Sequence, residues 1–181
     1  MIKVAEKDWE IFHKNFRMNR EELLPIFPYQ ANFKELKQLL LESKSSPVFN
    51  RRFNAILWRF PISMSESEFI ELLHFFLLEY WHHEHEEIIS SLQKYYNNDK
   101  NSINYLTKIM NELPDFYKYD EDLKYPFIRK IIYAIGAQPE PYNFEALETI
   151  SQSEDEEIKA LALHQIEKRK NLGRWESDSK K

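Results

Sequence analysis

The sequence of 181 residues predicts an all-α protein that forms a single compact domain. Apolar residues recur at helical spacing almost everywhere the sequence is periodic. Glycine occurs only twice, at Gly136 and Gly173, so the chain lacks the residues that hairpin turns and glycine-rich phosphate loops require. The composition, 43% apolar and 30% charged, is typical of a soluble globular protein. The absence of cysteine excludes disulfide scaffolds, cysteine-based zinc sites and cysteine nucleophiles.

The amino-terminal residues do not look like a secretory signal. The segment MIKVAEKDWEIFHKNFR has neither a long apolar run nor a small-residue cleavage site. The longest apolar segment, residues 69–78, is interrupted by Glu71 and His74 and is too short to span a bilayer. We therefore expect a cytoplasmic protein that has no membrane partner.

Three helices with one apolar face each are expected before residue 64. Pro25 and Pro28 separate the first from the second, residues 43–47 separate the second from the third, and Pro61 ends the third. The apolar faces are formed by Trp9, Phe12 and Phe16 in the first helix, by Phe33, Leu36, Leu39 and Leu40 in the second, and by Phe49, Phe53, Ile56, Leu57 and Phe60 in the third.

A fourth helix is expected to begin after Ser65. The tetrapeptide SESE at residues 65–68 has the pattern of a capping box, in which Ser65 and Glu68 each accept a hydrogen bond from the other's backbone N–H. The segment that follows, residues 69–77, is apolar around most of a helix circumference. That pattern is typical of a helix buried among others.

The chain after Trp81 predicts two helical pairs that repeat. The second helices of the two pairs carry Ile103, Leu106 and Ile109 in one case and Phe144, Leu147 and Ile150 in the other, at an offset of 41 residues. The first helices carry Ile88, Ile89 and Leu92, and Ile128, Ile131 and Ile132. This period is that of HEAT repeats, which bury their apolar faces by stacking into an α-solenoid. The alternative is that two unrelated hairpins share apolar positions by coincidence.

We therefore divide the chain into three parts. Residues 1–64 form an N-terminal helical part packed on the stack, and residues 65–170 form the HEAT-like helical repeats. A last helix over 156–170, with an outer polar face, closes the stack. Residues 171–181 have no apolar period and are expected to be a tail.

Four motifs resemble those of a family of small bacterial HEAT-repeat-like proteins. They are WHHEHEEI at residues 81–88, FYKYD at 116–120, RKIIYAIG at 129–136, and Ala146-Leu147. The similarity covers Trp81 to Arg169, and Ile135 and Glu87 stand where Leu and Asp are expected. Family members resemble immunity proteins encoded beside secreted toxins, including those of contact-dependent growth inhibition. The resemblance implies a binding protein that neutralises a cognate toxin and catalyses no reaction.

Charge is unevenly distributed along the chain. Residues 1–64 contain 11 Lys and Arg against 7 Asp and Glu, a net charge of +4, whereas residues 65–157 contain 7 against 20, a net charge of −13. The remaining residues, 158–181, contain 7 against 3, again +4. The acidic segment opposes nucleic-acid binding and attracts a basic protein, such as a nuclease toxin. Alternatively, a run such as Glu154–Glu157 only solvates the start of a helix.

The segment from Pro114 to Tyr125 is the candidate partner-binding loop. Tyrosine offers a large and stiff contact area, and acidic residues steer a basic partner. The candidate contacts are Asp115, Tyr117, Tyr119, Asp120, Glu121 and Asp122. The alternative is an ordinary loop between repeats whose tyrosines lean on the core.

Two further clusters carry rival functions. On a helix, His82, His85 and Glu86 would share one face at i, i+3 and i+4, a spacing that could hold a metal ion. The alternative is that Trp81 and His85 pack at the start of the first repeat. Arg51, Arg52 and Arg59 could bind an acidic ligand or a DNA backbone, although no aromatic platform accompanies them in the sequence.

No serine, histidine and aspartate set lies in a turn of the kind that holds a nucleophile, and Gly136 is expected to cap a helix in the left-handed conformation. The sequence thus favours a toxin-neutralising protein with no cofactor, no enzymatic activity and no nucleic-acid partner. The rival hypotheses are a HEAT-like nucleic-acid-binding or DNA-repair protein, a metal-binding protein that uses His82, His85 and Glu86, and a general adaptor.

Overall fold

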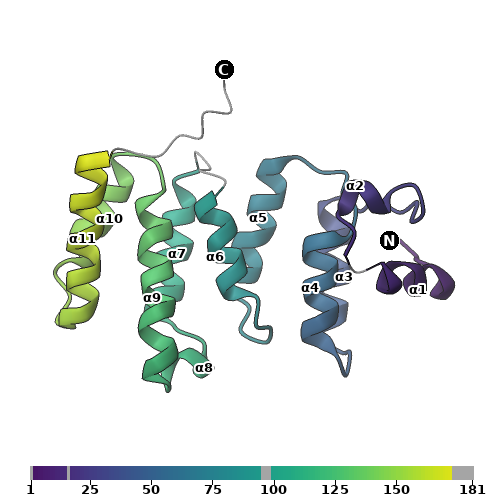
Figure 1. Cartoon of the computed structure of the whole chain (residues 1–181), viewed down its shortest axis with the longest axis horizontal. Coiled ribbons are helices and arrows are strands. Elements are labelled where there is room, and N and C mark those ends of the chain that lie inside the picture. Colours follow the sequence, from purple (N-terminus) through teal and green to yellow (C-terminus); the bar gives the residue numbers. More distant parts are fainter. Residues whose placement is uncertain (1, 16, 95–98, 173–181) are drawn as a thin grey trace. The chain divides into compact units, whose positions relative to one another are not determined.

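The computed structural model describes residues 2–15, 17–94 and 99–172. In these ranges the chain forms eleven helices, and helix makes up 69% of the structure (Figure 1). Extended pairing in the same ranges is limited to a single parallel bridge between Ala31 and Ile62. The predicted all-α class is confirmed.

The chain divides into two compact units. Unit 1 comprises Met1–Leu72 with Trp81–Glu84, and unit 2 comprises Leu73–Tyr80 with His85–Lys181. The division falls inside helix α5 (Glu66–Leu77), whereas the sequence suggested one compact domain whose N-terminal part ends at residue 64.

Unit 1 contains helices α1 (Glu6–Lys14), α2 (Arg20–Leu23), α3 (Phe33–Ser43) and α4 (Phe49–Arg59). α3 packs against α4, and the two helices match the predicted second and third apolar segments. Asn19 and Asn32 form capping boxes at the starts of α2 and α3. The sequence did not indicate α2, because four residues are too few to show a helical period. Phe16, placed on the first predicted helix face, lies outside the described residues.

An aromatic cluster forms the core of unit 1 near α1. The ring centroids of Phe12 and Phe27 lie 5.3 Å apart, and those of Phe27 and Phe60 lie 5.2 Å apart. Trp9 joins the cluster, with its ring 5.9 Å from that of Phe60. Arg20 donates from Nε to the carbonyl of Phe60 at 3.0 Å and from Nη2 to that of Leu57 at 2.6 Å. It thereby satisfies carbonyls that the end of α4 leaves without an intrahelical donor.

Helix α5 begins as the sequence predicts. The backbone N–H of Ser65 donates to Glu68 Oε2 at 2.8 Å, and the N–H of Glu68 donates to Ser65 Oγ at 3.3 Å. These hydrogen bonds are those of a capping box.

Unit 2 is organised around its longest buried helix. Its elements after α5 are α6 (His85–Lys94), α7 (Asn101–Asn111), α8 (Asp115–Lys118), α9 (Glu121–Gly136), α10 (Tyr142–Ile150) and α11 (Glu156–Leu172). α9 packs against each of the other five, as Figure 1 shows. The apolar positions predicted for the helical pairs are buried, except that Phe144 is half-buried.

Gly136 does not have the predicted left-handed conformation. It is the last residue of α9, and its φ lies outside the left-handed region. A Cβ atom at this position would stand 3.0 Å from Gln165 Oε1 of α11. The glycine therefore allows α11 to approach α9 closely, and sequence could not show this because the contact is made by a residue far along the chain.

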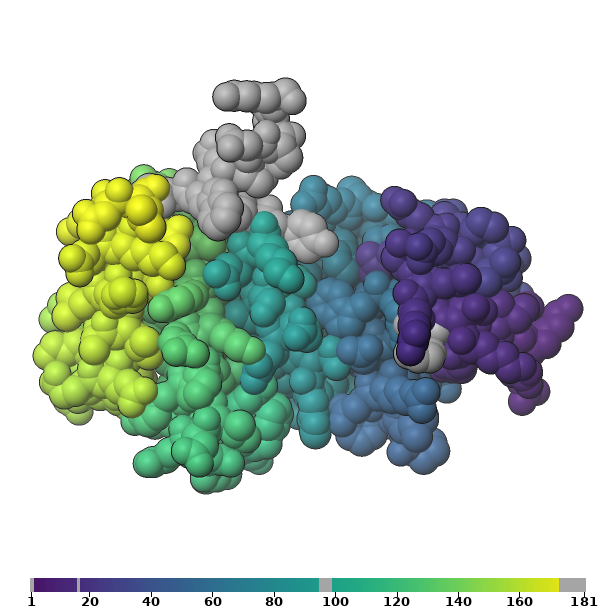
Figure 2. Space-filling view, viewed as in Figure 1, coloured from purple at the N-terminus to yellow at the C-terminus, as the bar shows by residue number. Residues whose placement is uncertain are grey.

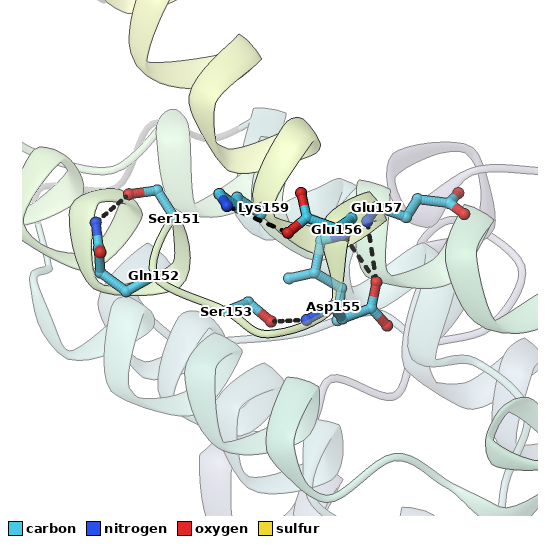
Figure 3. A network of polar contacts seen from close by, with 8 residues as sticks. Ser151, Gln152, Ser153, Asp155, Glu156, Glu157 and Lys159 are labelled. Carbon is cyan, nitrogen blue, oxygen red and sulfur yellow. Dashed lines mark hydrogen bonds and ion pairs between the residues drawn. The ribbon is translucent and has the colours of Figure 1, made fainter.

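The acidic run before α11 forms a helix cap, in agreement with the alternative interpretation of this run. Asp155 Oδ1 accepts hydrogen bonds from the N–H groups of Glu157 at 3.0 Å and Ile158 at 3.2 Å, and Lys159 pairs with Glu156 at 3.2 Å (Figure 3). The second oxygen of Asp155 accepts from the hydroxyl of Tyr125 at 3.0 Å. The cap thus also links α11 to α9.

We expect Asp155→Ala to lower the free energy of unfolding by about 1–2 kcal/mol, because it removes both the cap and the link to α9. Asp155→Asn should lose less, since an asparagine oxygen still accepts from the backbone N–H groups. Urea denaturation measures both values, and Glu154→Ala, an exposed neighbour, serves as the control. Equal losses for Asp155→Ala and Glu154→Ala would contradict the role of the cap.

Candidate functional site

The segment predicted to be a partner-binding loop is mostly helical. Asp115 begins the short helix α8, and Glu121 begins α9. Asp120 is the N-cap of α9, where its Oδ1 accepts from the N–H of Asp122 at 3.0 Å. The prediction of a loop was wrong because it gave no weight to local start signals: a proline before the first turn of α8 and an aspartate before α9.

Tyr117 belongs to the core rather than to the surface. It is 3% exposed, and its ring stacks on that of Phe127 with a centroid distance of 3.7 Å and an interplanar angle of 8°. Its hydroxyl donates to Glu86 Oε1 at 3.2 Å. Tyr117 therefore offers almost no surface to a partner in this structure, which agrees with the alternative of a tyrosine leaning on the core.

The other candidate contacts are exposed and lie together at one corner of unit 2. Tyr119 is 77% exposed, and the side chains of the four acidic candidates are also exposed. Two apolar residues of the same segment, which the sequence did not single out, are also exposed: Phe116 by 36% and Leu123 by 43%. We call this set the α8–α9 surface; its members are Asp115, Phe116, Tyr119, Asp120, Glu121, Asp122 and Leu123.

A hollow of about 510 Å³ adjoins the α8–α9 surface. Within it, the hydroxyl of Tyr80 donates to Glu112 Oε2 at 3.4 Å, and burial together with the charge of Glu112 raises the pKa of Tyr80. Figure 2 shows this corner of unit 2 in green. The hollow is lined by Tyr80, Asn111, Glu112, Leu113, Pro114, Asp115, Phe116 and Lys118. A hollow of this size, lined by apolar, acidic and basic residues, can receive a side chain from a partner protein.

Lys118 and Tyr119 form a cation–π contact on the α8–α9 side of unit 2. The ammonium of Lys118 lies 5.4 Å from the centroid of the Tyr119 ring. A highly exposed tyrosine whose face already attracts a cation is suited to contact lysine and arginine side chains of a basic partner. The α8–α9 surface therefore combines a cation-attracting ring, that of Tyr119, with carboxylates.

The three residues of the rival metal-binding hypothesis do not lie on one helix. His82 lies in the turn that precedes α6, so it does not share a helix face with His85 and Glu86. Its ring is buried and stacks on Phe53 at 4.2 Å, and its Nδ1 accepts from the N–H of Glu84 at 3.1 Å. Glu86 forms an ion pair with Lys130 of α9. Over the ranges that the structure covers, no three His, Cys, Asp or Glu residues are grouped so that they could hold a metal ion.

A histidine and a serine that the sequence did not connect lie together inside unit 2. His74 Nε2 and Ser102 Oγ are 2.8 Å apart, and the ring of His74 stacks on Tyr105 at 4.4 Å. The pair resembles a nucleophile and its base, but the two side chains are 3% and 0% exposed. A substrate cannot reach them, so the pair is structural. Burial lowers the pKa of His74, and the charge of Asp99 acts in the opposite direction.

Comparison with known proteins adds no assignment. No protein-family model matches the chain, and no curated protein or solved structure is significantly similar to it. Among the helices that the structure describes, none combines the length and the apolar character needed to cross a bilayer. A function is therefore inferred from the surface chemistry of the chain.

We expect Tyr117→Ala to lower the free energy of unfolding by about 3–5 kcal/mol, the usual cost of truncating a buried aromatic ring. Tyr117→Phe keeps the stacked ring and loses the hydrogen bond to Glu86, so its cost should be about 1 kcal/mol. The control is Tyr119→Ala, which should stay within about 0.5 kcal/mol of the parent. A small effect of Tyr117→Ala would show that the residue is not part of the core.

We expect the buried, neutral state of His74 to make stability depend on pH. Because the pKa of His74 is lower in the folded protein than the ordinary value of 6.5, the unfolded chain binds a proton that the folded chain excludes as the pH falls below 6.5. The free energy of unfolding should therefore fall between about pH 7 and pH 5, and His74→Gln should reduce this slope. Denaturation at several pH values tests this, with exposed His164→Gln as the control. An unchanged slope in His74→Gln would contradict the assignment.

Proposed function

We propose that this chain is an immunity protein, which binds a basic bacterial toxin, of the nuclease class, and neutralises it by covering its active site. The observation that carries the proposal is the α8–α9 surface, which combines four exposed carboxylates with the exposed side chains of Phe116, Tyr119 and Leu123. This surface lies in the segment with a net charge of −13. The motif resemblance between Trp81 and Arg169 points in the same direction.

The chemistry of a nuclease explains why such a surface would suit it. A nuclease binds phosphates, so its active site presents cationic groups. Carboxylates at the rim of an interface accelerate encounter with a cationic partner, and aromatic anchors at its centre slow dissociation. A protein that places both on one surface excludes nucleic acid from the toxin without catalysing a reaction or requiring a cofactor.

The proposal includes a HEAT-like stacking of helical hairpins in unit 2. In that arrangement α6 with α7 forms one hairpin, α9 with α10 forms the next, and α11 covers the end. It is supported by the offset of 41 residues between the apolar positions of α7 and α10, and by the packing of α9 against helices on both sides along the chain. We also propose that the protein acts in the cytoplasm, where it would meet an incoming toxin.

The experiment uses the C-terminal domain encoded immediately upstream of this gene as the toxin. We expect the triple variant Asp120→Asn, Glu121→Gln, Asp122→Asn to associate about tenfold more slowly at low salt, with little change in dissociation. Asparagine at position 120 retains the cap of α9. Stopped-flow mixing at several salt concentrations measures the effect, which should shrink as salt screens the charges.

A matched control removes the same number of charges elsewhere in unit 2. Glu154→Gln, Glu156→Gln, Glu157→Gln should leave association close to that of the parent. If the control slows association as much as the test variant, the effect comes from net charge, and the α8–α9 surface is not the contact. If neither variant changes association or protection of cells, the proposal fails.

The anchors are tested separately from the charges. Phe116→Ala and Tyr119→Ala should mainly accelerate dissociation, by about tenfold or more each, because truncated anchors lose desolvated contacts in the bound state. The helical circular dichroism of both variants should match that of the parent, since both side chains are exposed. Unchanged dissociation in both variants would remove these residues from the interface.

A further inference from the structure

A group of cations in unit 1 has no role in the proposed toxin contact. It consists of His13 at the end of α1 and Arg51, Arg52 and Arg59 of α4. Burial lowers the pKa of His13, and the charges of the three arginines lower it further. Burial also lowers the pKa of Arg59, and the charge of Arg51 adds to this effect. The geometry agrees with this repulsion, since His13 and Arg52 contact the same Trp9 ring and the three arginines share helix α4.

An aromatic ring holds the central arginine in place. The guanidinium of Arg52 lies 5.2 Å from the centroid of the Trp9 ring, and the ring of His13 stacks on the same indole at 5.9 Å. Trp9 is itself packed against Phe12 at 5.6 Å and Phe60 at 5.9 Å. This aromatic platform could not be recognised in the sequence, because it comes from α1, some 40 positions earlier in the chain than the arginines. Arg52 is thus positioned before any ligand binds, which reduces the entropy lost on binding.

The carboxylates of α1 are engaged elsewhere. Glu10 pairs with Lys14 at 3.5 Å, and Asp8 accepts a hydrogen bond from the hydroxyl of Tyr29 at 2.6 Å. Within residues 2–15, 17–94 and 99–172, no carboxylate forms an ion pair with Arg51 or Arg52. In addition, Nε of Arg52 is buried and has no hydrogen-bond partner. Arg51 and Arg52 therefore have no carboxylate that balances their charge within the described residues.

We propose that His13, Arg51, Arg52 and Arg59 form a binding site for a small ligand with two or more linked phosphate groups. Guanidinium groups match the geometry of phosphate oxygens and bind them through paired N–H donors. Arg52 and Arg59 are seven residues apart, about 10 Å along the axis of α4, so one ligand that reaches both carries more than one anionic group.

A small ligand fits this site better than a nucleic acid. Single-stranded nucleic acids gain affinity by stacking bases on exposed aromatic rings, whereas Trp9 has Arg52 and His13 against it. A long polyanion would also be repelled by a chain that carries −13 between residues 65 and 157. A compact polyphosphate carries its charge within the reach of the four cations.

Isothermal titration of the full chain with tripolyphosphate tests the proposal. We expect a single site that weakens as salt increases, and shifts of the His13 ring signals in NMR spectra on titration. Arg51→Gln should weaken binding about tenfold or more, the loss expected for one charged hydrogen bond. Its side chain is exposed, so this variant should keep its fold, whereas Arg52 packs on Trp9. Arg52→Lys, which keeps the charge without the paired donors, should weaken binding as well.

The control and the competing ligands decide the outcome. Lys34→Gln removes an exposed cation of α3 and should leave binding unchanged. ATP that binds as tightly as tripolyphosphate would show that the phosphate chain alone is recognised, and tighter binding of ATP would identify a nucleotide as the source of the phosphates. No binding of tripolyphosphate, equal binding by Arg51→Gln, or tighter binding of a 20-nucleotide single strand would overturn the proposal. None of these results depends on the toxin contact of unit 2.

Discussion

The burial of α9 determines what unit 2 can present to solvent. α9 packs against α6, α7, α8, α10 and α11, so most of its central turns are buried. Its first turn is exposed, and farther along the helix Pro126 and Arg129 are exposed as well. Tyr117 of α8 stacks on Phe127 of α9 and so holds the two helices together. Glu86 of α6 accepts a hydrogen bond from the hydroxyl of Tyr117 and forms an ion pair with Lys130 of α9. Stacked aromatic pairs stabilise beyond the area they bury. With Tyr117 held inside, Phe116 and Tyr119 on either side of it are left outside.

The two charged surfaces are held by different physical means. The carboxylates of the α8–α9 surface gather at the start of a helix, where the unpaired N–H groups and the helix dipole offset part of their mutual repulsion. Two of the cations of unit 1, Arg52 and His13, contact the indole ring of Trp9, whose face attracts Arg52 while the aromatic core fixes the ring. In both cases, local structure lowers the cost of collecting like charges. The surfaces are therefore suited to the ligands of opposite charge that we propose, a cationic protein in one case and a polyphosphate in the other.

Helical periodicity was sufficient to predict the longer helices and most of the buried residues, because apolar spacing reports directly which face is covered. The capping box at Ser65 could also be predicted, because its two partners are only three residues apart in the sequence. The errors concern contacts between distant residues or short local turns. Tyr117 was assigned to the surface because its partner Phe127 lies across a helix boundary, and His82 was placed on a helix although the chain turns before α6. Trp9 could not be connected to the arginines of α4 without the fold.

The central claim is that the α8–α9 surface covers a toxin while the core beneath it stays unchanged. Hydrogen exchange of backbone amides, measured with and without the upstream-encoded toxin domain, tests it most directly. If this surface covers the toxin, residues 115–123 should exchange more slowly on binding, with little change in the rest of α9, whose buried turns already exchange slowly. Protection confined to other parts of the chain, with residues 115–123 unaffected in a complex that forms, would contradict it.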